Sequence, residues 1–436
     1  MTWLQRHRVR HYVGNSIWIL PVLGMVAALG AVRLLNWVDA AMGWRSGFHP
    51  EAARTVLGTL SSSMFTLIVF VSSALLVAVQ LASAQLTPRV IAIVFKDPVT
   101  KFSLAAFVFA FTFTLAALVR IEDSVPLVTS SVAAYGCVAS LGVFLYLIDH
   151  MGKALRPSGA ARSVASLGRR VIESVYPRRL AESPDTSPDS ADVPGGEPSD
   201  TITSPTDGVV LAFDVRGLVS LAERADCVIE LVPQVGDFVA TKDALFRVFR
   251  GGATLPAGEL RGSVALGQER TLEQDPAFAF RILVDMASKG LSPAINDPTT
   301  AVLALDQIHH LLRTVGDRHL GDGRVRDAAG RLRLVYRTPD WADFVHLAVT
   351  EIRHFGAASI QVVRRLRAML ENLIEGLPEE RAALLRPELA LLHRSAERAF
   401  PDPEDQALAD ISDVQGVGGK YGQGRPGLQV NQATPR

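Results

Sequence analysis

Cysteine is almost absent from this 436-residue sequence, which contains only Cys137 and Cys227. Two cysteines cannot form a disulfide framework, so the simplest interpretation places the chain in a reducing compartment. Net charge is also absent, because Lys plus Arg and Asp plus Glu both number 44. A chain without excess positive charge offers no electrostatic case for a nucleic-acid partner.

Recognisable catalytic motifs are lacking as well: GxSxG, HExxH, the P-loop and CxxC do not occur. Asp306 and His310 have the i, i+4 spacing of a metal-binding pair, with His309 beside them. No third ligand follows at a recognisable spacing, and a solvated helix face explains these residues. We therefore predict no catalytic residue, no metal site, no cofactor and no enzymatic activity.

Apolar residues are abundant instead, and they concentrate in the first third of the chain, which raises the mean hydropathy to +0.23. Four runs approach or reach the roughly 20 residues that cross a bilayer. They are Ile17–Val32, Val56–Ala82, Phe102–Val119 and Leu127–Ile148. The first run, with its "ALGA", also imitates a signal peptide, but three further runs follow it. No charged residue lies in the middle of a run, which weakens the case for an ion-coupled transporter.

The loop charges predict the orientation of these spans. One side carries Arg6, Arg8, Arg10, Arg89, Lys96, Lys101, Lys153, Arg156 and Arg162; the other carries Arg33, Arg45, Arg54 and Arg120 beside Glu122 and Asp123. The positive-inside rule places both termini, and everything after the fourth span, in the cytoplasm.

The second span carries a polar pattern whose members share one helical face. They are Thr59, Ser62, Thr66, Ser73 and Gln80. Two interpretations stay open. If copies of this helix surrounded an axis, the face would line a polar pore. Alternatively, small and hydroxylated residues let helices pack closely in lipid, with Gly58 and Ser62 as a small-xxx-small contact.

Composition divides the chain into segments, and the fold class is mixed. We expect a basic cytoplasmic tail at 1–16, four transmembrane helices within 17–149, an amphipathic basic connector at 150–181, a disordered acidic linker at 182–207, a β-rich module at 208–262, a helical cytoplasmic domain at 263–400 and a disordered tail at 401–436. Expected cytoplasmic helices are Phe278–Lys289, Thr300–Val315, Trp341–Leu373 interrupted near Gly356, and Arg381–Phe400.

In the β-rich module we expect, in order, a strand, a helix, a strand, a Gly-Asp turn and a strand. This arrangement resembles the barrel-sandwich hybrid of biotinyl- and lipoyl-like modules. Those carriers place a modified lysine in a hairpin between their halves. Lys242 follows the Gly-Asp turn instead. The resemblance therefore implies a β-module that carries no cofactor.

Two cytoplasmic stretches invite functional interpretations. In "LGQERTLEQDP", Asp275 caps a helix, and Arg270 either binds an anion or pairs with Glu269 or Asp275. In "GLSPAINDPTTA", Asp297 and Pro298 suit a helix start, while Ser292, Pro293 and Asn296 suit a turn. A structural turn and a ligand- or ion-sensing loop both remain open. The first stretch also contains Gln274. The side-chain role of Asn296, including a meeting with Arg270 across the intervening helix, stays open.

These motifs resemble a bacterial family of predicted integral membrane proteins, the domain-of-unknown-function 2254 family. The resemblance rests on four motifs in chain order: "VAVQLASAQLTPRVI" (Val77–Ile91), "GDFV", "LGQERTLEQD" and "GLSPAINDPTTA" (Gly290–Ala301). It covers about Val56 to Phe355. It implies a multi-pass protein of the bacterial inner (plasma) membrane, and it implies no reaction.

Two functions from different classes follow. The first is a homo-oligomeric channel or permeation protein, in contact with membrane lipid and a small ion or ligand, with a cytoplasmic regulatory domain. The second is a non-conducting sensor or scaffold whose cytoplasmic domain binds a ligand or protein near Arg270 and Asn296. The sequence names neither a permeant ion nor a subunit number.

Overall fold

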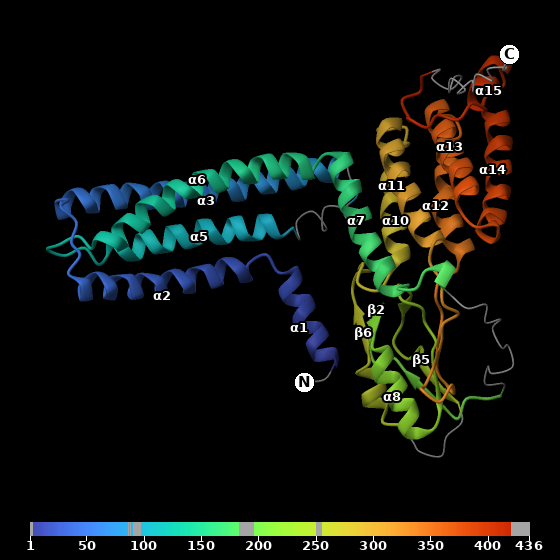
Figure 1. Ribbon diagram of the computed structural model, residues 1–436, viewed down its shortest axis with the longest axis horizontal. Helices are drawn as coiled ribbons and strands as arrows, with labels where there is room; N and C mark the ends of the chain where they lie inside the picture. The colour runs from blue at the N-terminus through green and yellow to red at the C-terminus, as the bar shows by residue number, and fades with distance from the viewer. Residues whose placement is uncertain are drawn as a thin grey trace, which may run out of the picture. The chain divides into compact units, whose positions relative to one another are not determined.

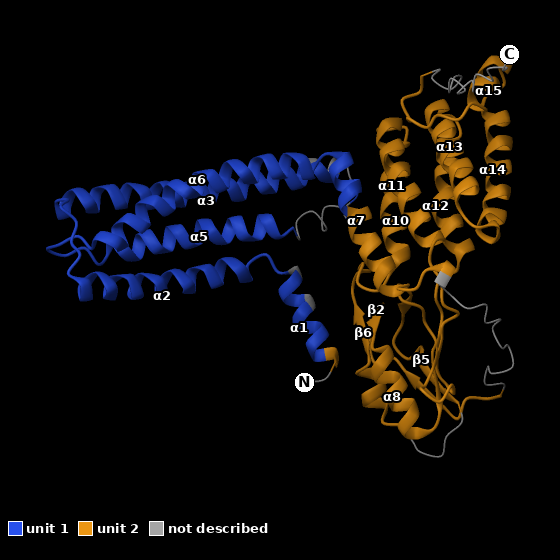
Figure 2. Cartoon of the chain, viewed as in Figure 1, with its two compact units in different colours: residues 1, 5–163 blue, residues 2–4, 164–436 orange. Residues whose placement is uncertain are grey.

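The computed structural model describes residues 3–85, 87, 89, 97–182, 196–249 and 255–419. The chain divides into two compact units, unit 1 (residues 1 and 5–163) and unit 2 (residues 2–4 and 164–436), coloured separately in Figure 2. The end of the Val77–Ile91 motif, residues 183–195 of the expected linker and residues 420–436 of the expected tail lie outside the described residues.

Unit 1 is helical (Figure 1). Its helices are α1 (Trp3–Asn15), α2 (Ile19–Met42), α3 (Pro50–Gln85), α5 (Pro98–Leu118) and α6 (Leu127–Ala154). The last four are long and apolar enough to cross a membrane, as the four apolar runs predicted. The first span was expected to end at Val32, but α2 continues to Met42. The expected basic tail forms the helix α1.

Helix α5 lies at the centre of unit 1, because it is the most buried of the four long helices and packs against α2, α3 and α6. Gly24 allows α2 and α5 to approach closely: a Cβ added there would lie 2.9 Å from the carbonyl oxygen of Ala105. Small residues bring helix backbones together in this way where a hydrophobic driving force between helices is weak.

Unit 2 begins with most of the amphipathic helix α7 (Pro157–Val175), which buries Val164, Ala165 and Ile172 and leaves its arginines exposed. Two sheets follow. The strands are β1 (Asp200–Thr203), β2 (Gly208–Phe213), β3 (Val228–Leu231), β4 (Phe238–Val239), β5 (Ala244–Phe249), β6 (Val264–Gly267), β7 (Arg324–Arg326) and β8 (Leu332–Tyr336). The larger sheet has the order β1-β5-β3-β8-β7, and the smaller has the order β4-β2-β6.

The predicted strand-helix-strand-turn-strand order is present, with α8 (Val215–Ala225) between β2 and β3. However, these strands divide between the two sheets, and β8 joins β3 in parallel from far along the chain. The module expected at 208–262 is therefore not a self-contained barrel-sandwich: it recruits β7 and β8 from the region expected to be helical, and β1 from the expected linker.

The remaining helices are α9 (Ala257–Arg261), α10 (Pro276–Gly290), α11 (Pro298–Gly316), α12 (Trp341–Gly356), α13 (Ile360–Gly376), α14 (Glu379–Ala399) and α15 (Pro403–Ala409), with the 3-10 turn Leu180–Glu182 after α7. The predicted interruption at Gly356 is present. The expectation of disorder from residue 401 is wrong for the described residues, because α15 and an ordered segment reaching residue 419 occupy that range.

Candidate functional site

Helix α3 has two opposite faces with different surroundings. Leu57, Met64 and Val71 recur every seven residues, are buried, and form the inner face that packs in unit 1. This face accounts for the contacts of α3 with α5 and α6. It uses none of the five polar residues singled out from the sequence.

The opposite face, which we name the α3 outer seam, follows steps of four and three residues. Its members are Thr55, Thr59, Ser62, Thr66, Val69, Ser73, Leu76 and Gln80, and all eight are exposed. Steps of four and three average 3.5 residues, the repeat that keeps one helix face against a partner helix. Thr55, Val69 and Leu76 were missed because only the polar residues of the core span were collected, although their spacing signals them.

The small-residue contact considered for this helix is not made with any residue that the structure describes. A Cβ added to Gly58 would meet nothing within 4 Å, and Ser62 is exposed. Helix packing inside one copy therefore does not explain the polar residues of the seam. Packing against a second copy remains compatible with them.

The hydroxyl groups of the seam are partly satisfied by their own helix. Thr59 Oγ1 donates to the Thr55 carbonyl at 2.9 Å, and Thr66 Oγ1 donates to the Ser62 carbonyl at 3.0 Å. Such bonds lower the cost of a hydroxyl in an apolar medium and leave its lone pairs available. The side-chain amide of Gln80 forms no hydrogen bond with the described residues, so it is the seam residue that most needs a polar neighbour.

A hollow of about 420 Å³ adjoins the seam between α3 and α6. It is almost entirely apolar and is lined by Leu60, Ser63, Met64, Thr66, Leu67, Phe70, Cys137, Val138, Leu141 and Phe144. Thr66 belongs to both the seam and the hollow. The two features therefore form one continuous surface on the outside of unit 1.

In unit 2 the structure gives Arg270 a structural partner. Its guanidinium pairs with the buried carboxylate of Asp275 and lies over the ring of Phe278, 5.5 Å from the ring centre. It also fills the space above Gly236, where an added Cβ would lie 2.5 Å from the guanidinium. The expected ion pair of Arg270 with Asp275 is thus present, and the "LGQERTLEQD" and "GDFV" motifs contact each other.

Asp275 and Gln274 join the helices to the small sheet. Asp275 caps α10 by accepting from the Phe278 amide at 3.0 Å. Burial raises the pKa of Asp275, an effect that the Arg270 hydrogen bond and charge oppose. Gln274 pairs with both backbone groups of Phe213, accepting from its amide at 3.0 Å and donating to its carbonyl at 3.3 Å.

The second motif lies at the other end of α10. Asp297 caps α11 by accepting from the Thr300 amide at 3.1 Å, with Pro298 in the first turn, and Ser292 donates to the Lys289 carbonyl at 2.7 Å. Pro293 is exposed. Because α10 has 15 residues, about 22 Å of helix separates this turn from Arg270. The structure therefore does not bring Asn296 and Arg270 together.

Asn296 instead has a backbone role. It is exposed and adopts a φ of 48°, in the left-handed region that asparagine tolerates better than other non-glycine residues. Its amide donates to the Ser292 carbonyl at 2.8 Å, which closes the turn between α10 and α11.

Replacing Asn296 tests this role. Asn296→Ala is expected to destabilise unit 2 by about 1 kcal/mol, because alanine pays a steric cost in the left-handed region, whereas Asn296→Gly is expected to be nearly neutral. Thermal unfolding of the full chain measures both. Equal loss of stability in the two variants would show that the Asn296 side chain, not its backbone, matters.

Two of the three residues considered for a metal pair, Asp306 and His309, have partners within the protein. Asp306 accepts from Arg365 Nε at 2.8 Å, and His309 lies 2.9 Å from the Asn372 side chain. Burial and the nearby Arg365 charge lower the pKa of His309. His310 is exposed. In the part of the chain that the structure describes, no three metal-ligating side chains gather.

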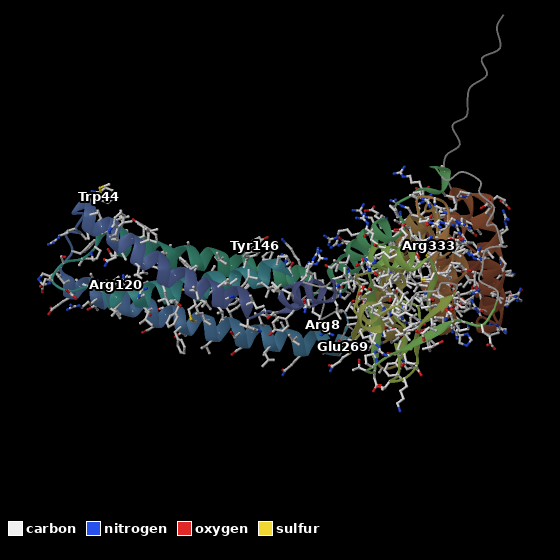
Figure 3. The ribbon with its side chains drawn as sticks, turned by 90° about the horizontal axis from the view of Figure 1, so that it is seen from below. Arg8, Trp44, Arg120, Tyr146, Glu269 and Arg333 are labelled. Atoms are coloured by element: carbon white, nitrogen blue, oxygen red, sulfur yellow. The ribbon has the colours of Figure 1, made fainter. Side chains whose placement is uncertain are left out.

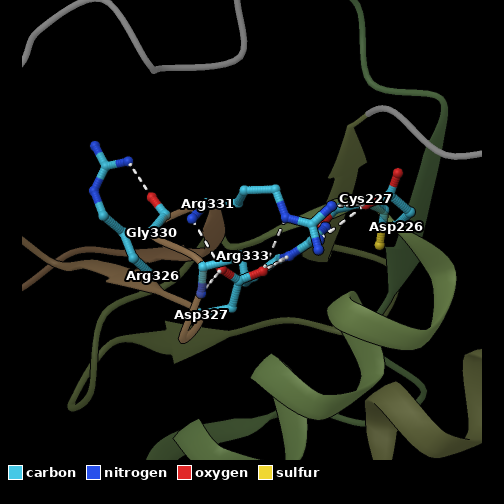
Figure 4. A network of polar contacts seen from close by, with 8 residues as sticks. Asp226, Cys227, Arg326, Asp327, Gly330, Arg331 and Arg333 are labelled. Carbon is cyan, nitrogen blue, oxygen red and sulfur yellow. Dashed lines mark hydrogen bonds and ion pairs between the residues drawn. The ribbon is translucent and has the colours of Figure 1, made fainter.

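A polar network that the sequence did not suggest lies at the β7–β8 hairpin (Figure 4). Arg333 is 3% exposed. Its Nε donates to Asp327 at 2.8 Å, its Nη1 donates to the Cys227 carbonyl at 3.3 Å, and its Nη2 lies 2.9 Å from Asp226. Asp327 also accepts from the amides of Ala329 and Arg331 in the hairpin turn.

This network predicts a pH effect. The Arg333 hydrogen bond is the main cause that lowers the pKa of Asp327 from 3.8 to about 2. A carboxylate with a lowered folded-state pKa stabilises the fold above about pH 4, and that stability is lost as the pH falls towards about 2. The difference in thermal stability between wild type and Asp327→Asn should therefore shrink between pH 5 and pH 2.5. A constant difference over this range would contradict the prediction.

The ends of unit 1 differ in charge. Figure 3 shows Trp44 and Arg120 at one end of the long helices and Arg8 towards the other. Arg6, Arg8 and Arg10 are exposed on α1, and Glu122 and Asp123 are exposed in the loop after Arg120. The same view labels Glu269 and Arg333 in unit 2.

Comparison with known proteins identifies a family and relatives that this chain resembles. Residues 14–372 match a family described as predicted membrane proteins (domain of unknown function 2254). An uncharacterized protein of Mycobacterium tuberculosis is 27% identical over 426 residues, which cover 93% of this chain and 80% of the relative. An uncharacterized protein of Mycobacterium bovis has the same identity and coverage. No solved structure matches significantly. The match includes the α3 outer seam and both motifs.

Proposed function

We propose that this chain, which belongs to the family of predicted membrane proteins described as DUF2254, is a homo-oligomeric channel or permeation protein of the bacterial inner (plasma) membrane. In this proposal, α2, α3, α5 and α6 cross the bilayer, and copies associate through the α3 outer seam. Both termini lie in the cytoplasm, where unit 2 regulates or assembles the oligomer. The permeant species is a small ion or ligand, and the chain catalyses no reaction.

One observation carries the proposal: α3 presents a second helix-packing repeat on a face that none of the described helices of its own chain covers. Lipid would not favour the alternation of Thr, Ser and Gln along a span, since each polar group costs free energy without a partner. A second copy of α3 supplies small, hydroxylated partners at matching spacing. Copies arranged around an axis would also turn the hydroxyl groups and Gln80 towards water.

The distribution of charge supports the orientation. The end of unit 1 that carries α1 has exposed arginines, whereas the loop at the opposite end mixes Arg120 with Glu122 and Asp123. Positively charged loops remain on the cytoplasmic side. Arg54 at the opposite end is engaged with the backbone, donating to the carbonyl of Ile121 at 2.6 Å.

Disulfide cross-linking in membranes tests the association. In a background without native thiols (Cys137→Ala, Cys227→Ala), Thr59→Cys and Thr66→Cys are expected to form dimers on mild oxidation. Leu23→Cys, on the exposed face of α2, serves as the control and should remain monomeric. Cross-linking at Leu23 but not on the seam would show that α3 does not form the interface between copies.

Planar-bilayer recording tests permeation. Ser73→Val is expected to reduce the conductance of purified protein more than tenfold, since it replaces a polar pore-lining group with an apolar one. Gln80→Leu and Thr66→Val should act in the same direction. Ser72→Val is the matched control, because Ser72 is exposed on the same helix outside the seam. Absence of conductance in the wild type, or conductance unchanged by the seam variants, would reject a channel.

A non-conducting scaffold or sensor is the second candidate, and a feature at one end of the unit 2 helices favours it. Phe355 and Ile295 are 58% and 36% exposed there, and Leu291 approaches the end of α12 at Gly356. A hollow of about 330 Å³ lies beside Phe355. Stable co-purification of a soluble partner that Phe355→Ser abolishes, together with no conductance, would favour this function.

A further inference from the structure

Helix α1 is placed where a membrane surface would lie. Residues 16–18 separate it from the first span, and Figure 1 shows α1 leaving the direction of α2 at this point. Trp18 in this break is 56% exposed, in the position of an interfacial anchor. The break keeps α1 from extending the span.

A buried lysine fixes the end of α1. Lys101 Nζ donates to the carbonyl of Gly14, and Lys101 is only 5% exposed. Lys101 belongs to the first turn of α5, another span. The contact therefore holds the C-terminal end of α1 at the level where the spans end.

The exposed face of α1 is apolar at its centre. Val9, Tyr12 and Val13 are 51%, 59% and 44% exposed, and their spacing of three and four residues places them on one face. Arg8 borders this face beside Tyr12, four residues away. Arg6 and Arg10 border its other side, each three residues from a valine.

The three arginines are exposed, and no carboxylate among the described residues pairs with them. Val9, Tyr12 and Val13 form a short apolar patch on a helix that is polar overall, and the exposed Gln5 lies on the same face one turn before Val9. Three unpaired guanidinium groups beside such a patch, at the level where the spans end, are placed to reach anionic headgroups. Long arginine side chains can cover apolar surface with their stems while their charged ends stay at the phosphate level.

We propose that α1 is an interfacial helix that binds anionic phospholipid headgroups through Arg6, Arg8 and Arg10. Guanidinium groups bind phosphate oxygens in a bidentate geometry, and the anionic surface attracts them in addition. A free anion in solution would bind without using Val9, Tyr12 and Val13, whereas a lipid engages both parts of the surface. This inference concerns the lipid partner and does not depend on conductance.

The test uses the full chain reconstituted in nanodiscs that contain equal amounts of phosphatidylcholine and phosphatidylglycerol. Spin-labelled analogues of each lipid report which species the protein surface retains. The wild type is expected to prefer the anionic lipid roughly threefold or more at low salt, and the preference should decline in high salt. The variant Arg6→Gln/Arg8→Gln/Arg10→Gln should show almost no preference.

A matched variant, Arg33→Gln/Arg45→Gln/Arg120→Gln, removes the same charge from residues outside α1 and should keep the preference. Resistance of the buried Cys137 to thiol reagents verifies that each variant is folded, and protease protection verifies its orientation. Equal retention of both lipids by the wild type would overturn the proposal. A preference that survives loss of all three α1 arginines would overturn it as well.

Discussion

Replacing Asp39 with alanine is expected to lower the free energy of unfolding of unit 1 by about 3 kcal/mol. Asp39 is 3% exposed near the end of α2, yet it caps a different helix. Its carboxylate accepts from the Val128 amide at 2.9 Å, from the Thr129 amide at 2.9 Å and from the Thr129 hydroxyl at 2.7 Å. Helix α6 begins at Leu127 after Pro126, which has no side-chain cap to offer.

The loss is large because the first amides of a helix have no intrahelical acceptor. Without Asp39, the buried Thr129 amide and hydroxyl and the partly buried Val128 amide lose a charged acceptor at once. Asp39→Asn should cost less, about 1 kcal/mol, because its amide oxygen still accepts from the α6 amides.

The two native cysteines allow each unit to be followed separately. Cys137 is buried in unit 1 and Cys227 in unit 2. In a Cys227→Ala background, maleimide labelling of Cys137 during heating should occur roughly 6–12 °C lower in Asp39→Ala than in the parent. Asp123→Ala removes an exposed carboxylate at the same end and should not shift the transition. An equal shift of the labelling temperature in both variants would contradict the capping role of Asp39.

Replacing Arg364 with leucine is expected to have a comparable effect on unit 2, about 4 kcal/mol. Arg364 on α13 is fully buried. It donates to three backbone carbonyls: Nε to Ile411 at 2.9 Å, Nη1 to Gly418 at 3.1 Å and Nη2 to Gly419 at 2.9 Å. Among the described residues no carboxylate pairs with it, so its positive charge is stabilised by carbonyl dipoles.

The segment 411–419 depends on this side chain, and Asp413 completes its turn. The Asp413 carboxylate accepts from the amides of Gly416 at 2.9 Å and Gly418 at 2.6 Å, and both glycines have positive φ. Leucine would leave three carbonyls unpaired and release the segment. Lysine should restore little, because one ammonium group cannot reproduce the planar fork of arginine.

Hydrogen exchange of the peptide 411–419, with thiol labelling of Cys227 in a Cys137→Ala background, measures both consequences. Arg364→Leu should abolish protection at Gly416 and Gly418 and lower the unfolding temperature. Arg386→Leu is the control, because Arg386 forms an exposed ion pair with Glu379 and should change neither quantity. Retained protection in Arg364→Leu would mean that Asp413 alone orders the segment.

Asp39 and Arg364 illustrate what could not be predicted from the sequence. The first span was expected to end at Val32, since Arg33 and Asp39 interrupt its apolar run. The helix continues because Arg33 is exposed and because Asp39 is stabilised by amides 89 and 90 residues away. Likewise, the sequence around Arg364 predicts an ordinary helical arginine. Its burial depends on the segment after α15, which packs against it.

The sheet shows the same limit. Strands β2, β3 and β5 could be predicted from short β-branched runs in the sequence. The turn before β4 could be predicted from its Gly-Asp pair. Pairing of β3 with β8 joins Ile229 to Leu334, and nothing in either strand specifies the other. The hairpin β7–β8 was therefore assigned to the helical domain, and β1 to the linker.

The sequence by itself determined the four apolar spans, the caps at Asp275 and Asp297, the turn that contains Asn296 and the break at Gly356. Each depends on hydrophobicity or hydrogen bonds within a few residues, which adjacent letters specify. The tertiary structure alone decided which face of α3 is covered, which partner Arg270 takes and where Asp39 and Arg364 are satisfied. These outcomes depend on contacts between distant segments, and such contacts form only when the fold brings buried charges and unpaired backbone groups together.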